Sequence, residues 1–242
     1  MKILLIRHGD PDYEKDSLTE KGWHEAELLA QRMAELEIQS FYVSPLGRAK
    51  DTASCTLKKM GREAEELAWL REFHAPIPDF HTGEPRIPWD QLPADWTAEP
   101  KYYDNIRWAE TLPMLEGHVI DEVNRGWNGL DEVLAKHGYV RNGNYYDAVS
   151  PNEDTLAFFC HFGVTCVMLS HLLGISPMIL WHGFCAAPTS VTSLITEERR
   201  KGVALFRMNA FGDTAHLFAN HEEPAFAARF CEIFANQEQR HD

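Results

Sequence analysis

The stretch Ile3-Leu4-Leu5-Ile6-Arg7-His8-Gly9 decides the fold of this chain. Four consecutive apolar residues that stop at charged and polar ones are typical of a strand buried on both faces, as in a parallel sheet covered by helices. We therefore predict a central strand over residues 3–6, with Arg7 and His8 at its carboxyl end.

Strand-like and helical patterns alternate after this strand. Ser17 and Glu20 form a capping-box pattern, which precedes apolar residues at helical spacing up to residue 36. Further strands are predicted over residues 38–43, 65–70 and 155–160, and further helices over residues 48–60, 112–136, 164–173 and 224–237. Because such alternation implies parallel pairing through right-handed crossovers, the predicted fold class is α/β, a three-layer α/β/α sandwich with a mostly parallel central sheet.

Two hairpins are also predicted. Asn142-Gly143 separates two short Tyr-containing segments, and this dipeptide readily adopts the positive φ angles of a tight turn. Residues 189–196 and 203–208 are late strands that we expect to pair with each other.

Residues 73–113 contain many Pro, Trp and Tyr residues without any periodicity. A segment of this length in a compact domain is typically functional or disordered, and the aromatic content argues against disorder. We interpret residues 1–242 as a single domain with an inserted aromatic and Pro-rich cap segment, about residues 73–150, over the site.

The composition limits the partners. A formal net charge of -14 argues against nucleic-acid and anionic-membrane partners, and no apolar run approaches the roughly 20 residues of a membrane span. A small phosphorylated substrate stays compatible, because a few local cations outweigh a distant, screened acidic surface.

The five cysteines are widely spaced and lack C-x-x-C pairs, which indicates reduced thiols in a cytoplasmic protein. The apolar run after Met1-Lys2 is also too short for a signal peptide. The sequence leaves open whether the chain forms a homodimer.

Five chemically active residues fall at the carboxyl ends of predicted strands or just after them. They are Arg7, His8, Arg48, Glu72 and His161. That edge of an open parallel sheet is where ligands bind, so these side chains are expected to converge.

Two guanidiniums and two imidazoles suit a phosphoryl group. Arginine offers planar, bidentate donors to phosphate oxygens, and additional cations stabilise the charge of the transferring group. One imidazole has to be neutral to attack phosphorus. The leaving alkoxide needs a proton, which an acidic side chain at the rim can supply if its environment keeps it protonated.

With these motifs in this order, the chain resembles the histidine phosphatase superfamily, the phosphoglycerate-mutase-like fold. The stretches that carry the resemblance are Leu5-Ile6-Arg7-His8-Gly9, Leu18-Thr19-Glu20-Lys21-Gly22, Ser44-Pro45-Leu46-Gly47-Arg48-Ala49-Lys50-Asp51-Thr52-Ala53, Leu70-Arg71-Glu72 and Cys160-His161-Phe162-Gly163. Each fragment alone is weak, but the ordered set is specific. It covers the chain to about Leu173, except for residues 73–154.

The resemblance implies a role for each matching residue. His8 is expected to be the nucleophile that becomes phosphohistidine, Arg7 and Arg48 to bind the phosphate, and His161 to stabilise the transferring group in its protonated form. Glu72 matches the position of the proton donor, which afterwards activates water. The resemblance implies no metal and no other cofactor, and the histidines show no H-x-x-x-H or H-E-x-x-H spacing.

Two residues depart from the family pattern. Pro11 stands where many members carry Ser, Thr or Asn, so one polar contact to phosphate is missing or supplied elsewhere. Phe162 stands where many members have Gly directly after the second histidine, which tightens the approach to the backbone.

Several alternatives stay open. Asp10, Glu84 or Asp154 are alternatives to Glu72 as the acid, and His74 and His81 are candidates for the substrate pocket; these alternatives all rest on sequence position alone. The leading function is hydrolysis of a phosphomonoester of a small metabolite. One alternative function is a phosphoglycerate-type mutase that uses the same pocket. The other is a non-catalytic regulatory protein that binds phosphate in this pocket.

Overall fold

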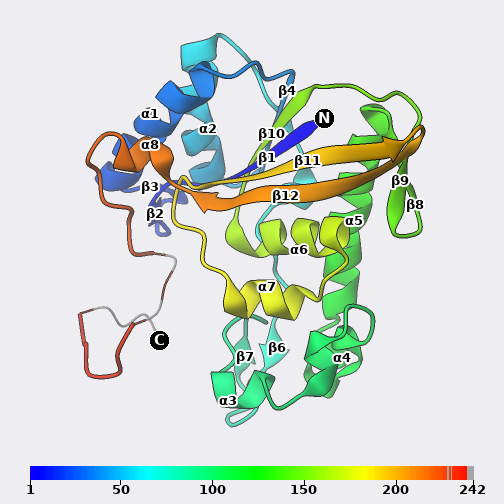
Figure 1. Cartoon of the computed structure of the whole chain (residues 1–242). Helices are drawn as coiled ribbons and strands as arrows, with labels where there is room; N and C mark the ends of the chain where they lie inside the picture. Colours follow the sequence, from blue (N-terminus) through cyan, green and yellow to red (C-terminus); the bar gives the residue numbers. More distant parts are fainter. Residues whose placement is uncertain (228, 230, 239–242) are drawn as a thin grey trace.

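The structure is a computed structural model that describes residues 1–227, 229 and 231–238 of the chain. An eight-stranded sheet in the order β5-β4-β10-β1-β11-β12-β9-β8 forms its centre (Figure 1). Its strands are β1 (Lys2–Arg7), β4 (Ser40–Val43), β5 (Glu65–Glu66), β8 (Tyr139–Asn142), β9 (Tyr145–Ala148), β10 (Thr155–Cys160), β11 (Val191–Arg200) and β12 (Val203–Asp213).

Helices flank the sheet, and two two-stranded ribbons lie outside it. The helices are α1 (Glu20–Ala34), α2 (Gly47–Met60), α3 (Pro93–Trp96), α4 (Leu112–Glu116), α5 (Val119–Lys136), α6 (Phe162–Leu173), α7 (Pro177–Gly183) and α8 (Ala215–Phe218), with 3₁₀ turns at Ala68–Leu70, Pro100–Tyr103 and Trp108–Glu110. The ribbons pair β2 (Pro11–Asp12) with β3 (Ser17–Leu18), and β6 (Ile77–Pro78) with β7 (Pro85–Arg86).

The central strand β1 is buried on both faces, as its apolar run predicts. Successive side chains of a strand point to opposite faces, so Ile3 and Leu5 enter one apolar cluster while Leu4 and Ile6 enter the other. The cluster around Leu4 and Ile6 includes side chains of α1 and α2.

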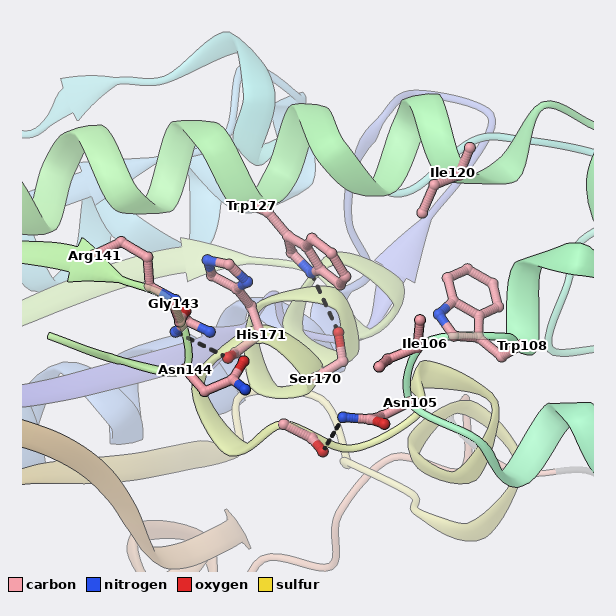
Figure 2. A pocket seen from close by; sticks show the side chains of 11 residues that line it. Asn105, Ile106, Trp108, Ile120, Trp127, Arg141, Gly143, Asn144, Ser170 and His171 are labelled. Atoms are coloured by element: carbon pink, nitrogen blue, oxygen red, sulfur yellow. Dashed lines mark hydrogen bonds between the residues drawn. The ribbon is translucent and has the colours of Figure 1, made fainter.

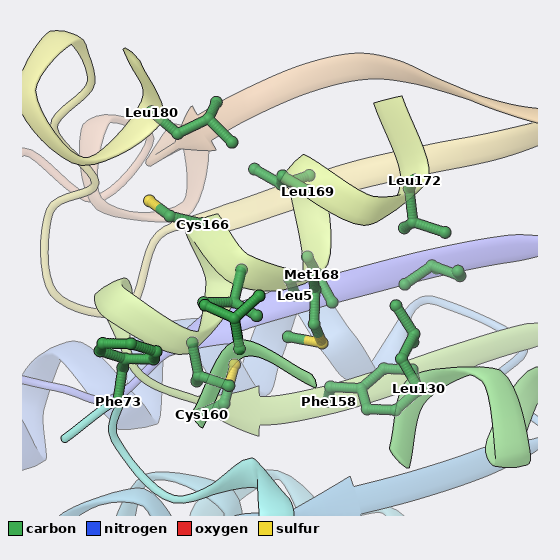
Figure 3. Packing of buried hydrophobic residues seen from close by; sticks show 14 of the residues in the cluster. Leu5, Phe73, Leu130, Phe158, Cys160, Cys166, Met168, Leu169, Leu172 and Leu180 are labelled. Carbon is green, nitrogen blue, oxygen red and sulfur yellow. The ribbon is translucent and has the colours of Figure 1, made fainter. Parts of the chain in front are cut away.

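The other cluster contains side chains of α5, α6 and α7 packed on the sheet. In Figure 3, Leu5 and Phe158 of the strands lie among Met168 and Leu172 of α6 and Leu130 of α5. Helix α6 is apolar on nearly its whole circumference, because it lies between the sheet and the other helices of this layer.

The prediction of a mostly parallel sheet is wrong. Strands β5, β4, β10 and β1 pair in parallel, but β1 with β11, β11 with β12, β12 with β9 and β9 with β8 pair antiparallel. Both predicted hairpins exist, and both belong to the central sheet. They extend it beyond β1 with strands of alternating direction, so the fold is a mixed α/β sheet flanked by helices.

Two predicted elements differ in extent. The strand predicted over residues 65–70 is only Glu65–Glu66, followed by a 3₁₀ turn. The helix predicted over residues 112–136 is interrupted at Gly117-His118, where His118 has a φ of 48°. A Cβ on Gly117 would lie 2.7 Å from the carbonyl oxygen of Pro76, so α4 packs too closely on β6 to continue straight into α5.

The predicted start of the first helix and the predicted last helix of the chain are also wrong. Thr19, and not Ser17, caps α1, because its side chain accepts from the N–H of Gly22. The helix predicted over residues 224–237 is absent from the described residues of that range, which form turns and bends; residues 228 and 230 lie outside the description.

The segment after residue 72 is not structureless. It contains the β6/β7 ribbon, α3, α4 and two 3₁₀ turns, with Tyr102 and Trp108 fully buried. Helix α7 was not predicted, although Ser176-Pro177 carries a start signal: the Ser176 side chain accepts from the N–H of Met178.

Candidate active site

The carboxyl ends of three adjacent parallel strands meet at one edge of the sheet. Arg7 pairs with Cys160 across β1 and β10, and Phe159 pairs with Val43 across β10 and β4. His8, Ser44 and His161 each follow one of these strands, so the sheet register itself brings them together.

His8 is buried, with 2% of its surface exposed, and its ring is oriented by the backbone. The Nδ1 atom lies 2.7 Å from the carbonyl oxygen of Gly9. A carbonyl oxygen only accepts, so Nδ1 carries the proton and Nε2 keeps its lone pair in the neutral ring. Burial, and then the charges of Arg7 and Arg48, hold the pKa of His8 well below its usual value, which favours this neutral form.

His161 lies beside His8 and is fully buried. The two ring centroids are 5.1 Å apart and the planes are tilted by 56°. The Nε2 atom of His161 lies 2.7 Å from the hydroxyl oxygen of Ser44. Burial is the main cause that holds the pKa of His161 well below its usual value, and His8, Arg48 and Arg7 act in the same direction.

Arg7 and Arg48 are fixed by oxygen acceptors at one end of each guanidinium. The Nη1 atom of Arg7 donates to the carbonyl oxygen of Ala186 at 2.6 Å, and Nη1 of Arg48 donates to the carboxylate of Asp16 at 2.6 Å. The exposed ring of Tyr13 lies 5.4 Å from the guanidinium of Arg48. Both arginines are thus held in place before any anion binds.

Three buried donor nitrogens of this cluster have no hydrogen-bond partner among the described residues. They are Nε of Arg7, Nε of Arg48 and Nδ1 of His161. Because a buried polar group without a partner is costly, such atoms mark a place where a ligand completes the hydrogen bonding. The charges of both arginines act on both imidazoles, so the four side chains form one cationic cluster that suits a phosphoryl group.

Glu72 lies against the N-terminus of α6, which begins directly after His161. Its carboxylate accepts from the backbone N–H groups of Phe73 at 2.7 Å, Val164 at 3.1 Å and Gly163 at 3.3 Å. Burial raises the pKa of this carboxyl, and the backbone N–H groups oppose that rise. Its charge also acts on Arg7, which places Glu72 beside the cationic cluster.

The three alternative acids are placed differently. Asp154 precedes β10 and so lies at the opposite edge of the sheet from His161. Glu84 is exposed on the β6/β7 ribbon, and the carboxylate of Asp10 accepts from the hydroxyl of Thr19. Of the four carboxyl groups, Glu72 is the one whose charge acts on Arg7 in this structure.

His74 and His81 stand apart from the cluster. The backbone N–H of His74 donates to Glu122 of α5, and its side chain is exposed. The ring of His81 lies 3.0 Å from the carboxylate of Asp95. Their role in binding substrate stays a prediction.

Sequence reasoning missed the residues that hold the reactive ones. Asp16 positions Arg48, Ser44 contacts His161, and the hydroxyl of Thr52 accepts from the N–H of Gly9. The segment 186–190 holds the backbone of His8 in place, because the N–H of Thr189 donates to the carbonyl oxygen of His8. Ser44 and Thr52 lie in the motif around Arg48, which was a usable signal; Asp16 and Thr189 had none.

A separate cavity lies away from this cluster. A cavity of about 380 Å³ is lined by residues of α5, α6, the 105–108 segment and the β8/β9 hairpin (Figure 2). Its polar groups bind one another: the indole N–H of Trp127 donates to Ser170, and Arg141 donates to the carbonyl oxygen of His171. None of the residues predicted for the site lines this cavity.

Two further findings concern the described part of the chain. It contains no group of three or more His, Cys, Asp or Glu side chains arranged to hold a metal ion. None of its helices is long and apolar enough to cross a membrane.

Comparison with known proteins points to one family. The family model described as histidine phosphatase superfamily (branch 1) matches residues 3–209. A probable phosphatase of Schizosaccharomyces pombe is 24% identical over 90% of this chain and 95% of that protein. A probable phosphoglycerate mutase GpmB of Photorhabdus laumondii is 36% identical, but over only 31% of this chain and 39% of that protein.

A solved structure shares the fold. The phosphoserine phosphatase of Entamoeba histolytica, crystallised as a mutant with phosphoserine, superposes with a TM-score of 0.59 at 19% identity, over 89% of this chain and 98% of that one.

Proposed function

Because the chain belongs to the histidine phosphatase superfamily, whose activities are of the phosphatase and mutase type, we propose that it hydrolyses the phosphomonoester of a small metabolite through a phosphohistidine at His8. The observation that carries this proposal is the cluster of three unpartnered buried donors, Nε of Arg7, Nε of Arg48 and Nδ1 of His161, beside the lone pair of His8 Nε2. A phosphoryl group supplies acceptor oxygens to all three.

In the first step, Nε2 of His8 attacks phosphorus and the bond from phosphorus to the ester oxygen breaks. Arg7, Arg48 and His161 donate to the phosphoryl oxygens, which carry the developing charge. The carboxyl of Glu72 gives its proton to the leaving alkoxide, so the alcohol departs neutral.

In the second step, water attacks phosphorus and the bond to Nε2 of His8 breaks. The ionised carboxylate of Glu72 takes the proton of the attacking water and is thereby returned to its acid form. Inorganic phosphate leaves, and the ring of His8 is neutral again because Nδ1 has kept its proton throughout.

Glu72 suits this double role for a physical reason. Burial favours its protonated form, while the backbone N–H groups at the start of α6 favour its ionised form. A carboxyl between these opposing influences exchanges its proton without a large cost in either direction.

Residues 73–150 are proposed to select the alcohol part of the substrate. Trp89 lies against Phe162, with ring centroids 6.5 Å apart, and a Cβ on Gly163 would meet both Trp89 and Glu72 within 3 Å. The inserted segment therefore reaches the proposed acid, where the leaving group must lie.

The test is a rapid acid-free quench of the protein with a ³²P-labelled phosphomonoester, followed by peptide mapping of the acid-labile label. We expect label on His8 and none in a His8→Ala variant, which should also lose at least about a thousandfold in kcat. His118→Ala, which alters an exposed histidine, is the matched control and should keep both. Full turnover by His8→Ala would refute the proposal, and phosphate binding without turnover on a broad substrate panel would favour a non-catalytic protein.

A mutase is the second candidate, since 31% of the chain is similar to a probable phosphoglycerate mutase. A mutase uses the same phosphohistidine but returns the phosphoryl group to another hydroxyl. Incubation with 3-phosphoglycerate separates the two: release of inorganic phosphate supports the phosphatase, and isomer formation without release supports the mutase.

A further inference from the structure

We infer that Ser44 is a positioning residue that holds His161 as its neutral Nδ1–H tautomer, so that His161 binds the phosphoryl group as an uncharged donor. This inference rests on the proposed function and refines it. The resemblance to the family implied a protonated His161; the hydrogen bonds around this ring lead to a different protonation state.

The hydroxyl of Ser44 is fully buried, and its hydrogen bonds can be counted. Ser44 directly follows β4, and its Oγ accepts from the N–H of Leu46 at 3.2 Å. The other described atom bonded to Oγ is Nε2 of His161, at 2.7 Å. A hydroxyl has one proton to donate. Because the N–H of Leu46 is itself a donor, Nε2 of His161 is the acceptor available for that proton.

The opposite assignment leaves a buried group unsatisfied. If Nε2 of His161 carried a proton, Oγ would accept from both Leu46 and His161, and the Ser44 hydroxyl proton would have no acceptor among the described residues. An unpaired buried donor is destabilising. The Ser44 hydroxyl therefore donates to Nε2, and the proton of the neutral ring resides on Nδ1.

The position of Nδ1 fits this assignment. It is buried without a partner among the described residues, like Nε of Arg7 and Nε of Arg48. The two imidazoles then carry opposite tautomers: His8 offers a lone pair at Nε2, and His161 offers a proton at Nδ1.

The surrounding charges act in the same direction. The titratable and charged groups that face the His161 ring are His8 from the end of β1, Arg7 from the same strand and Arg48 from α2. Burial is the largest cause that makes an imidazolium unfavourable at this place, and the two guanidiniums act in the same direction. Glu72, the nearest carboxylate at this end of α6, is engaged with backbone N–H groups of that helix. Two guanidiniums already offset a phosphate dianion, so a neutral donor adds a hydrogen bond without adding a charge.

The direct test is ¹⁵N NMR of the imidazole nitrogens in histidine-labelled full-length protein with inorganic phosphate bound. His161→Gln assigns the signals by their loss. We expect the His161 ring at pH 7 to show a protonated Nδ1 and an unprotonated Nε2. Two protonated nitrogens, or a proton on Nε2 alone, would overturn the inference.

Steady-state kinetics of Ser44 variants provide a second test of the inference. Ser44→Ala releases the ring, so the productive tautomer is populated only in part. We expect kcat/KM to fall about tenfold, as loss of one buried hydrogen-bond partner implies, and the NMR spectrum of the variant to show a proton on Nε2 in part of the molecules. Ser44→Cys keeps a weak donor of similar size and should retain more activity, and Ser54→Ala, on the exposed side of α2, should change nothing.

A merely structural role gives a different pattern. A loss of kcat/KM with an unchanged NMR spectrum of Ser44→Ala would contradict the inference, and circular dichroism identifies a variant that fails to fold. If the wild-type protein hydrolyses no phosphomonoester, the proposed function fails, while the NMR spectrum still decides the tautomer.

Discussion

The imidazole rings of His8 and His161 lie with their centroids 5.1 Å apart. This separation follows from the sheet: the two residues directly follow Arg7 and Cys160, which are register partners of the parallel strands β1 and β10. Neighbouring strands are spaced by about 4.8 Å, so the strand pairing fixes the distance between the proposed nucleophile and the second imidazole. Burial, and then the neighbouring guanidiniums, lower the pKa of both rings, so both are expected to be neutral without substrate.

Asp16 should matter through Arg48. Its carboxylate accepts from Nη1 of Arg48 and from the N–H of Gly47, so it fixes the guanidinium at the start of α2. We expect Asp16→Ala to lower kcat/KM about tenfold, because a mobile arginine loses its geometry on phosphate. Steady-state kinetics measure this.

Asp12→Ala is the control for that measurement. Asp12 lies in the same loop but pairs with the exposed Lys15, so its loss should leave kcat/KM within twofold. An equal effect of the two substitutions would show that the loop as a whole, and not the contact with Arg48, matters.

Glu72→Gln should distinguish an acid from a structural residue through the leaving group. Glutamine cannot protonate an alkoxide, so we expect the rate of phosphorylation of His8, measured by rapid quench, to fall by about 10²–10⁴ for alkyl phosphates and much less for p-nitrophenyl phosphate, whose phenolate leaves without a proton. Because the pKa of Glu72 is raised, the rate of the phosphorylation step for alkyl esters, measured by rapid quench, should fall as pH increases through that pKa. The same loss for both esters would argue against general-acid catalysis by this residue.

Gly163→Ala should damage the site by a steric clash. Its added Cβ would lie 2.6 Å from the ring of Trp89 and 2.7 Å from Oε1 of Glu72, so at least one of them must move. We expect kcat to drop at least tenfold with the fold retained. Gly183→Ala, at a helical glycine with open space around it, should leave kcat unchanged and thereby controls for the substitution itself.

Glu25 should make stability depend on pH. It is fully buried in α1, accepts from the N–H of Ala225, and burial raises its pKa to about 7. The folded state therefore retains a proton that the unfolded chain loses near pH 4.5, so the free energy of unfolding should decrease as pH rises from 4.5 to 7, by roughly 1.4 kcal/mol per pH unit at most from this group.

Glu25→Gln should flatten that dependence, and urea unfolding at pH 5 and pH 7.5 measures it. Glu27→Gln changes an exposed residue of the same helix and should keep the wild-type slope. A Glu25→Gln protein with an unchanged slope would show that other groups cause the pH dependence.

The family and much of the fold could be predicted from the sequence. The apolar run of β1 predicts a strand buried on both faces, and its alternate residues indeed enter two different apolar clusters. Local turn chemistry likewise predicts the hairpin at Asn142-Gly143. These features are local, because a few neighbouring residues determine them.

Strand direction and pairing across the sheet are not local. The strand pattern of residues 189–208 predicts a hairpin, but nothing in it states that β11 pairs antiparallel with β1. The need for a glycine at position 117, next to the break, likewise depends on the close approach of Pro76, 41 residues earlier in the chain. Such features follow from contacts between distant segments.

The same division holds for the site. The sequence by itself determined which residues are chemically able to bind and transfer a phosphoryl group, since Arg7, His8, Arg48, Glu72 and His161 stand in ordered motifs. Only the tertiary structure decided which nitrogen of each histidine is available, because that depends on the partners at the other nitrogen: the carbonyl oxygen of Gly9 for His8 and the hydroxyl of Ser44 for His161. For His161, the direction and the distance of this hydrogen bond exist only once β4 and β10, the strands that Ser44 and His161 follow, are paired.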